Sequence, residues 1–245
     1  MFCYTASVTT NTCEDTMNYF LKPLIFLLII FSYVTPNLAQ RDTADNARKQ
    51  SVILSDIPEK VDRKARYLFY LHGKIVEAGN TRPTSEKFGV YEYEQILEAF
   101  RQSGFVVISE PRKKDTDIEQ YGRRVAEQVE KLLKAGVSPK YITVVGASQG
   151  SWITMLASTY LNNRKLNFVI IAGCNKSIFA KVNLHGNVLS IYEKSDGTGT
   201  CEQFRDSATN LGKYKELELN TGLGHGFIYR PMKEWIEPSV AWAQR

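Results

Sequence analysis

The sequence predicts an α/β fold with a mostly parallel sheet of about six strands and helices on both faces. Short apolar runs rich in β-branched or aromatic residues alternate with helical stretches from residue 67 to the C-terminus. Glycines follow several of the helical stretches, as expected of helix ends. The 245 residues are 43% hydrophobic and 23% charged, which fits one globular domain with a full core.

The first half of the chain contains two polar segments, one before the first predicted strand and one after it. Residues 41–60 form a loose entry segment with a short apolar patch at 52–54, and residues 75–89 form a long loop. That loop leaves a strand end, where open α/β sheets bind ligands. Strands are expected at 67–71 and 105–108, and helices with apolar stripes at 91–100 and 116–133.

The second half continues the alternation. Apolar runs predict strands at 142–145, 168–172 and 188–192, and the alternation of leucine with glutamate predicts an edge strand at 217–219. Helices are expected at 153–161, at 201–212 and from 231 onward, and Pro238 is expected to break or re-initiate the last one.

The N-terminal residues 1–39 are predicted to be a leader and signal peptide, which leaves one domain at 40–245. The apolar run at 23–31 follows Lys22 and is shorter than the roughly 20 residues that span a bilayer. It fits a signal-peptide core with cleavage after Ala39. An uncleaved membrane anchor is the alternative.

Export to the periplasm or to the medium follows from this interpretation, with no stable membrane partner after cleavage. The polar start is unusual for a signal peptide, so Met17 competes with Met1 as the first residue. The net charge of +5 comes from scattered basic residues with no aromatic-interleaved basic stripe, which argues against a nucleic-acid partner. The oligomeric state stays open.

The most informative segment is Gly146-Ala-Ser148-Gln-Gly150, between the strand at 142–145 and the helix at 153–161. Gly-x-Ser-x-Gly alone occurs by chance in roughly one chain in ten of this length. Between a strand and a helix, however, it describes a tight turn that exposes a serine hydroxyl beside free helix N–H groups. The alternative is a turn whose serine only caps the helix.

This segment resembles the nucleophile elbow of the α/β-hydrolase superfamily, and the resemblance covers residue 67 to the C-terminus. It implies a nucleophilic Ser148 followed along the chain by an acid and then a histidine. Many members insert a lid domain between strands that correspond to 168–172 and 188–192, but this chain has no room for one. The resemblance is therefore to small, lidless exported esterases or thioesterases with an open, shallow pocket.

An acid is expected just past the strand at 188–192, where it would orient the histidine. Asp196 has the favoured residue type and position, and Gly197 suits a turn there. Glu193 is the second candidate, and a plain Asp-Gly turn is the alternative without a catalytic role.

The histidine has three candidates. His72 precedes the serine, and His185 lies between two strands on the side expected to face away from the site. His225 follows the last strand among glycines, and it completes the order Ser148, Asp196, His225. An imidazole there can take the serine proton and return it to the leaving group. A solvated loop histidine is the alternative.

Two backbone N–H groups are expected to form the oxyanion hole implied by the resemblance. One belongs to Gln149, the residue after the nucleophile, and the other to Lys74 or its neighbour, after His72-Gly73. The side chain of His72 is expected to be a packed strand-end histidine.

Cys174 and Cys201 are the two cysteines outside the leader, and both follow strand ends on the predicted catalytic edge. A disulfide between them would hold the turn that carries Asp196. Two free thiols are the alternative.

No metal or cofactor is expected, because the histidines are dispersed and no phosphate-binding glycine loop is present. Arg112-Lys113-Lys114 follows a strand end, and we expect a solvated basic loop there in preference to a site that attracts anionic substrates.

The predicted function is serine hydrolysis of an ester or thioester in a small-molecule acyl substrate, through an acyl-enzyme. A non-catalytic binding protein on the same fold is one alternative. A peptidase or amidase with the same triad is another.

Overall fold

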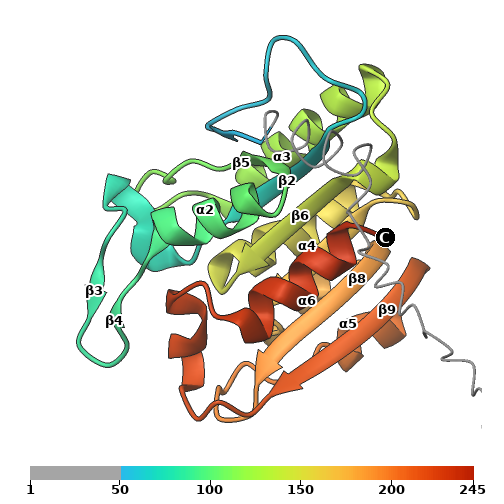
Figure 1. Ribbon diagram of the computed structural model, residues 1–245. Helices are drawn as coiled ribbons and strands as arrows, with labels where there is room; N and C mark the ends of the chain where they lie inside the picture. Colours follow the sequence, from blue (N-terminus) through green and yellow to red (C-terminus); the bar gives the residue numbers. More distant parts are fainter. Residues whose placement is uncertain (1–50) are drawn as a thin grey trace, which may run out of the picture. The chain divides into compact units, whose positions relative to one another are not determined.

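The computed structural model describes residues 51–245, so the predicted leader, signal peptide and start positions lie outside the described residues. The described part is built on a sheet in which every neighbouring pair of strands is parallel (Figure 1). In spatial order its strands are β1 (Ile53–Leu54), β5 (Phe105–Ile108), β2 (Arg66–Leu71), β6 (Ile142–Ala147), β7 (Asn167–Ile171), β8 (His185–Glu193) and β9 (Asn210–Leu219).

The two faces of this sheet carry two separate apolar cores. Residues alternate across a strand, so Tyr67 and Phe69 of β2 enter one core while Leu68 and Tyr70 enter the other. Because both faces are covered, the central strands are apolar throughout. The α/β fold class with helices on both faces is confirmed.

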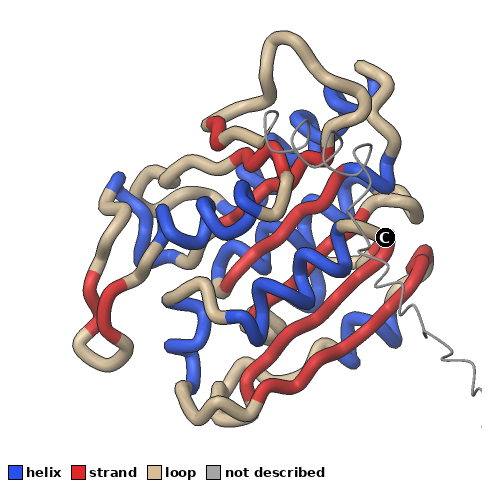
Figure 2. The backbone as a smooth tube through the Cα atoms, viewed as in Figure 1, coloured by secondary structure: helices blue, strands red, loops and turns tan. Residues whose placement is uncertain are grey.

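Helices far apart in the sequence cover each face (Figures 1 and 2). One core contains residues of α3 (Ile118–Lys134), α4 (Gln149–Leu161) and α5 (Glu202–Ser207). The other contains residues of α2 (Tyr93–Gln102) and α6 (Lys233–Ala243), including the buried Trp235 and Trp242.

The sheet has seven strands where about six were expected, because the entry segment supplies one. The N–H groups of Val107 and Ser109 donate to the carbonyls of Val52 and Leu54, each at 2.8 Å. The apolar patch at 52–54 therefore adds the edge strand β1 to β5. Two paired residues are too short a strand for a periodicity to identify.

Three other expectations need correction. The segment 75–89 is not simply a loop, since it contains most of the 3₁₀ helix η1 (Lys74–Gly79) and most of a hairpin of β3 (Thr84–Ser85) and β4 (Gly89–Val90). The helix expected at 201–212 ends at Ser207, because residues from 210 onward pair with β8. Pro238 lies inside the continuous helix α6 without interrupting it.

Because the strands are parallel, their C-terminal ends meet at one edge of the sheet. The segments after β2, β6, β8 and β9 all emerge at this edge, and they carry the predicted site residues. Within residues 51–245, no helix is both long enough and apolar enough to cross a membrane.

Candidate active site

Ser148 occupies a strained turn between β6 and α4. Its backbone has φ 54° and ψ −120°, a conformation that a non-glycine residue rarely adopts. The turn is fixed by the Ser148 N–H, which donates to the Ile171 carbonyl of β7 at 2.9 Å. Behind it, the Ser151 hydroxyl is buried within 2.7 Å of the carbonyls of Gly146 and Ile171.

Both glycines of the motif are required by close backbone approach. A Cβ at Gly146 would lie 2.2 Å from the carbonyl oxygen of Gly150, across the turn. A Cβ at Gly150 would lie 1.9 Å from the carbonyl oxygen of Leu71, at the end of β2. The first turn of α4 is therefore pressed against the strand from which the predicted oxyanion loop leaves.

The structure brings Ser148, His225 and Asp196 into one chain of hydrogen bonds. His225 Nε2 lies 2.9 Å from Ser148 Oγ, and His225 Nδ1 lies 2.7 Å from Asp196 Oδ2. A carboxylate can only accept, so Nδ1 carries the proton and Nε2 is left to accept the serine hydroxyl hydrogen. The Asp196 side chain is 8% exposed and that of His225 is 26% exposed, so the histidine faces solvent more than the carboxylate does.

Glu193, the second candidate for the acid, holds the histidine loop instead. One carboxylate oxygen accepts from the N–H and the hydroxyl of Thr221, at 2.9 and 2.8 Å, and the other accepts from the Ser195 hydroxyl at 3.0 Å. Ser195 Oγ in turn accepts from the Gly224 N–H at 3.0 Å. Burial acts to raise the pKa of Glu193, but these hydrogen bonds outweigh burial and lower it.

The two predicted oxyanion donors both begin helices beside the serine. Gln149 is the first residue of α4 and Lys74 is the first residue of η1, so neither N–H has a partner within its own helix. A Cβ at Gly73 would lie 3.5 Å from Ser148 Cβ, which places the start of η1 next to Ser148. Within residues 51–245, no backbone group accepts from either N–H.

His72 is fully buried and serves the loop structurally, as expected of its side chain. Its Nδ1 donates to the Gly73 carbonyl at 2.8 Å, and its Nε2 accepts from the Arg112 N–H at 2.9 Å. Burial, together with the positive charge of Arg112, lowers the pKa of His72 to about 3. The ring is therefore neutral at neutral pH and in one fixed tautomer.

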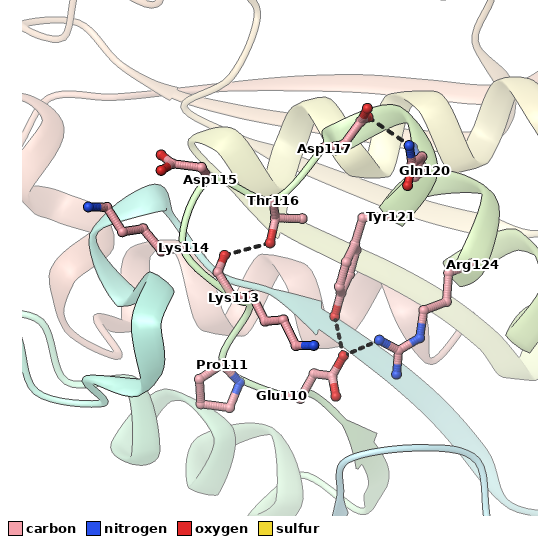
Figure 3. Close-up of a pocket in the computed structure, with 10 residues that line it drawn as sticks. All are labelled: Glu110, Pro111, Lys113, Lys114, Asp115, Thr116, Asp117, Gln120, Tyr121 and Arg124. Atoms are coloured by element: carbon pink, nitrogen blue, oxygen red, sulfur yellow. Dashed lines mark hydrogen bonds and ion pairs between the residues drawn. The ribbon is translucent and has the colours of Figure 1, made fainter.

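Arg112 contradicts the expectation of a solvated basic loop, since it is 2% exposed. Only Lys113 and Lys114 remain exposed, and they line a surface cleft of about 560 Å³ (Figure 3). In that cleft Glu110 accepts hydrogen bonds from Tyr121 and Arg124. The sequence of a basic triplet does not reveal which residue is buried, because burial depends on distant segments, here those of His72 and Gln149.

Two apolar residues lie near His225, Phe88 in space and Leu223 in sequence. The ring of Phe88, from the β3–β4 hairpin, lies 6.4 Å from the His225 ring between centroids. Leu223, two residues before His225, is 46% exposed. The loop η4 (Gly224–Tyr229) passes so close to Phe88 that a Cβ at Gly226 would lie 2.8 Å from its ring. The sequence offered no signal for the position of Phe88.

Cys174 and Cys201 form a disulfide, with a Cα–Cα distance of 5.1 Å. It joins the segment after β7 to the start of α5, and the turn of Asp196 lies between β8 and that helix.

His185 begins β8, at the opposite edge of the sheet from the site. The structure thus separates His72 and His185 from the serine and brings only His225 to it.

No protein-family model matches the sequence, and no curated protein matches it either. Among solved structures the chain is similar to SOBER1 of Arabidopsis thaliana, at 14% identity and a TM-score of 0.50, over 74% of this chain and 98% of that one. It is also similar to a truncated carbohydrate esterase from gut microbiota, at 13% identity and a TM-score of 0.50, over 77% and 90% of the two chains. A bifunctional GH43-CE protein of Bacteroides eggerthii matches at 12% identity and a TM-score of 0.51, over 76% of this chain and 35% of that one. These similarities show that the chain has the α/β-hydrolase fold.

Proposed function

From this fold and site, we propose that the protein is a serine hydrolase that cleaves an ester or thioester through an acyl-enzyme intermediate. The observation that carries the proposal is the hydrogen-bonded chain from Ser148 through His225 to Asp196, with distances of 2.9 and 2.7 Å. A nucleophile, a base that can accept its proton, and a carboxylate that orients the base are what acyl transfer requires.

In the proposed mechanism Ser148 Oγ attacks the acyl carbonyl carbon while its proton passes to His225 Nε2. Asp196 accepts the hydrogen bond from Nδ1 and stabilises the imidazolium that forms. The N–H groups of Gln149 and Lys74 donate to the carbonyl oxygen as it becomes negative. His225 then protonates the leaving group, and a water molecule, deprotonated by the same histidine, releases the acid from Ser148.

Ester or thioester cleavage is preferred over amide cleavage for two reasons. One solved structure of the same fold is described as a carbohydrate esterase. In addition, the rim beside His225 presents the apolar side chains of Phe88 and Leu223, which suit an acyl or alkyl group. A peptidase or amidase would use the same triad, so the leaving group has to be determined by experiment.

The proposal is tested by the rate of labelling with a fluorophosphonate probe. We expect the wild-type protein to be labelled and both Ser148→Ala and His225→Ala to lose labelling, since one lacks the nucleophile and the other lacks its base. The matched control is His185→Ala, which removes a histidine at the far edge of the sheet and should label at the wild-type rate. A folded wild-type protein that does not label would contradict the proposal and favour a non-catalytic binding protein.

Substrate class is tested separately with p-nitrophenyl esters of several chain lengths and with matched p-nitroanilides. Turnover of esters but not anilides, abolished by Ser148→Ala, is the expected result. Anilide turnover at a comparable rate would instead assign a peptidase or amidase.

We further propose that the protein is exported, in agreement with its disulfide, because such bonds persist in oxidising compartments. N-terminal sequencing of the mature protein tests both the export and the predicted cleavage after Ala39.

A further inference from the structure

Arg112 lies in the loop between β5 and α3, and its hydrogen bonds go to the two segments that carry the predicted oxyanion donors. Its backbone N–H donates to His72 Nε2 at 2.9 Å, and its carbonyl accepts from the Ala78 N–H at 2.9 Å. The loop 72–78 is therefore attached to the Arg112 backbone near both of its ends.

The guanidinium extends this attachment to the elbow helix. Its Nη2 donates to the His72 carbonyl at 2.7 Å and to Gln149 Oε1 at 3.0 Å. One nitrogen thus joins the loop before Lys74 to the side chain of Gln149. Lys74 and Gln149 are the two residues whose backbone N–H groups are proposed to bind the oxyanion, and Arg112 connects the two segments that carry them.

Within residues 51–245 no carboxylate lies at hydrogen-bond distance from the deeply buried Arg112 guanidinium, whose central carbon lies 5.7 Å from the centroid of the Tyr121 ring. Glu77 Oε1 lies 3.7 Å from Arg112 Nε, too far for a hydrogen bond. Arg112 Nε, Arg112 Nη1 and Glu77 Oε1 are all buried without a hydrogen-bond partner within residues 51–245. A buried ion pair with unsatisfied atoms contributes little net stability compared with an apolar pair of similar volume. Stability alone is therefore a weak reason for this arginine.

We propose that Arg112 is a positioning residue that holds the loop 72–78 against the first turn of α4, so that the Lys74 and Gln149 N–H groups point at the same oxyanion. This inference rests on the proposed serine-hydrolase function. Arg112 does not touch the reacting atoms, and it acts through the His72 carbonyl and the Gln149 side chain. Displacing either donor by an ångström is enough to lower the rate strongly.

The test compares rate constants of fluorophosphonate labelling, because the phosphonyl oxygen occupies the oxyanion hole whatever the natural substrate is. The main variant combines Arg112→Met with Glu77→Gln, which removes both buried charges together. Arg112→Lys is the conservative variant, since its ammonium can replace one of the two side-chain hydrogen bonds. The matched control is Arg66→Met, because Arg66 also donates to a backbone carbonyl, that of Ala243 at 2.9 Å, but at the other end of the sheet.

We expect the rate constant of the double variant to fall by about 10- to 100-fold, less than the 100- to 1,000-fold effect of removing a whole oxyanion donor. Arg112→Lys should recover part of the loss, and Arg66→Met should label at the wild-type rate. The pH at which the rate is half-maximal should stay unchanged, because His225 and Asp196 are not altered. A shift in that pH would show a disturbed triad and would overturn the assignment to the oxyanion hole.

If the double variant does not fold, Gln149→Ala tests the inference instead, because it removes one hydrogen bond of Arg112 and keeps the backbone N–H of residue 149. A reduced labelling rate is expected, and a wild-type rate in Gln149→Ala or in the folded double variant overturns the inference. The wild type and Ser148→Ala are measured alongside. Absent labelling of the wild type is a failure of the proposed function, whereas a labelled wild type with fully active Arg112 variants is a failure of this inference alone.

Discussion

On the nucleophile side of the site, formed by residues 71–78 and 146–154, backbone segments lie in direct contact. On the acid–base side, formed by residues 193–201 and 221–226, hydrogen bonds and a disulfide hold separate loops together. Gly150 approaches β2 so closely that no Cβ fits, whereas Gly197 has nothing within 4 Å of the corresponding position. Close backbone packing, together with the Ser148 N–H bond to the Ile171 carbonyl, therefore fixes the serine, whereas side-chain hydrogen bonds and the disulfide fix its partners.

This difference predicts how each side responds to solution conditions. The approach of Gly150 to the Leu71 carbonyl involves only backbone atoms, so neither mild acid nor reductant should loosen this contact. The loop of His225, in contrast, is attached through the carboxylate of Glu193, and the segment after Asp196 is attached through the disulfide. The acid–base side is the one that a pH below the lowered pKa of Glu193, or a reductant, should release.

The largest expected effect is that of Gly150→Ala. Its Cβ would lie 1.9 Å from the Leu71 carbonyl oxygen, so the strand and the helix have to separate. We expect a loss of about 4 kcal/mol or more in the free energy of unfolding, beyond the usual range for overpacking, together with loss of fluorophosphonate labelling. Urea unfolding measures the first and labelling the second.

The matched control is Gly197→Ala on the acid–base side, where the added methyl group meets open space. It should change the free energy of unfolding by less than about 0.5 kcal/mol. Equal effects of the two substitutions would break the comparison between the tightly packed turn of Ser148 and the open turn of Asp196.

The next effect is that of removing the disulfide with Cys174→Ala and Cys201→Ala. The bond closes a loop with a sequence separation of 27 residues, which corresponds to about 3.5 kcal/mol in the chain-entropy model. The double variant should unfold at correspondingly lower urea concentration, and reduction of the wild type should have the same effect. An unchanged unfolding curve would mean that the segments are held equally well by their other contacts.

The smallest of the three destabilising effects is expected for Glu193→Gln, which keeps the shape of the side chain but removes its charge. At neutral pH we expect the free energy of unfolding to fall by about 2 kcal/mol, since the charge-assisted hydrogen bonds to Thr221 and Ser195 become neutral. The loosened histidine loop should also slow fluorophosphonate labelling. The measurement is urea unfolding of both proteins at several pH values.

The effect of pH on the stability difference between wild type and Glu193→Gln follows from the pKa of Glu193. The pKa of Glu193 is lowered in the folded protein, so its stabilisation is fully present above the ordinary value of 4.5 and is lost as the pH falls through the folded pKa. The difference between wild type and Glu193→Gln should therefore shrink toward zero in acid. A difference that stays constant with pH would show that the carboxylate charge is not what holds the loop.

Much of the fold, and the segments that form the candidate site, could be predicted from local sequence patterns. Apolar runs marked the central strands because both faces of a parallel sheet are buried, and the glycines around Ser148 marked a turn that only glycine can flank. The two-residue strand β1 was missed, and the end of the helix near 207 was misplaced, because both depend on pairing with strands distant in the sequence. Pro238 broke a local rule without ending its helix.

By itself the sequence determined which residue types were available and their order: a serine at a strand–helix turn, acids after a later strand, and a histidine among glycines. The tertiary structure decided which acid meets the histidine. Asp196 faces His225, while Glu193, three residues earlier, bonds to Thr221. It also decided that Arg112, in a basic triplet, is buried against the loop 72–78. Both outcomes depend on contacts between segments at least 28 residues apart, and such distances in space are not encoded in any local pattern.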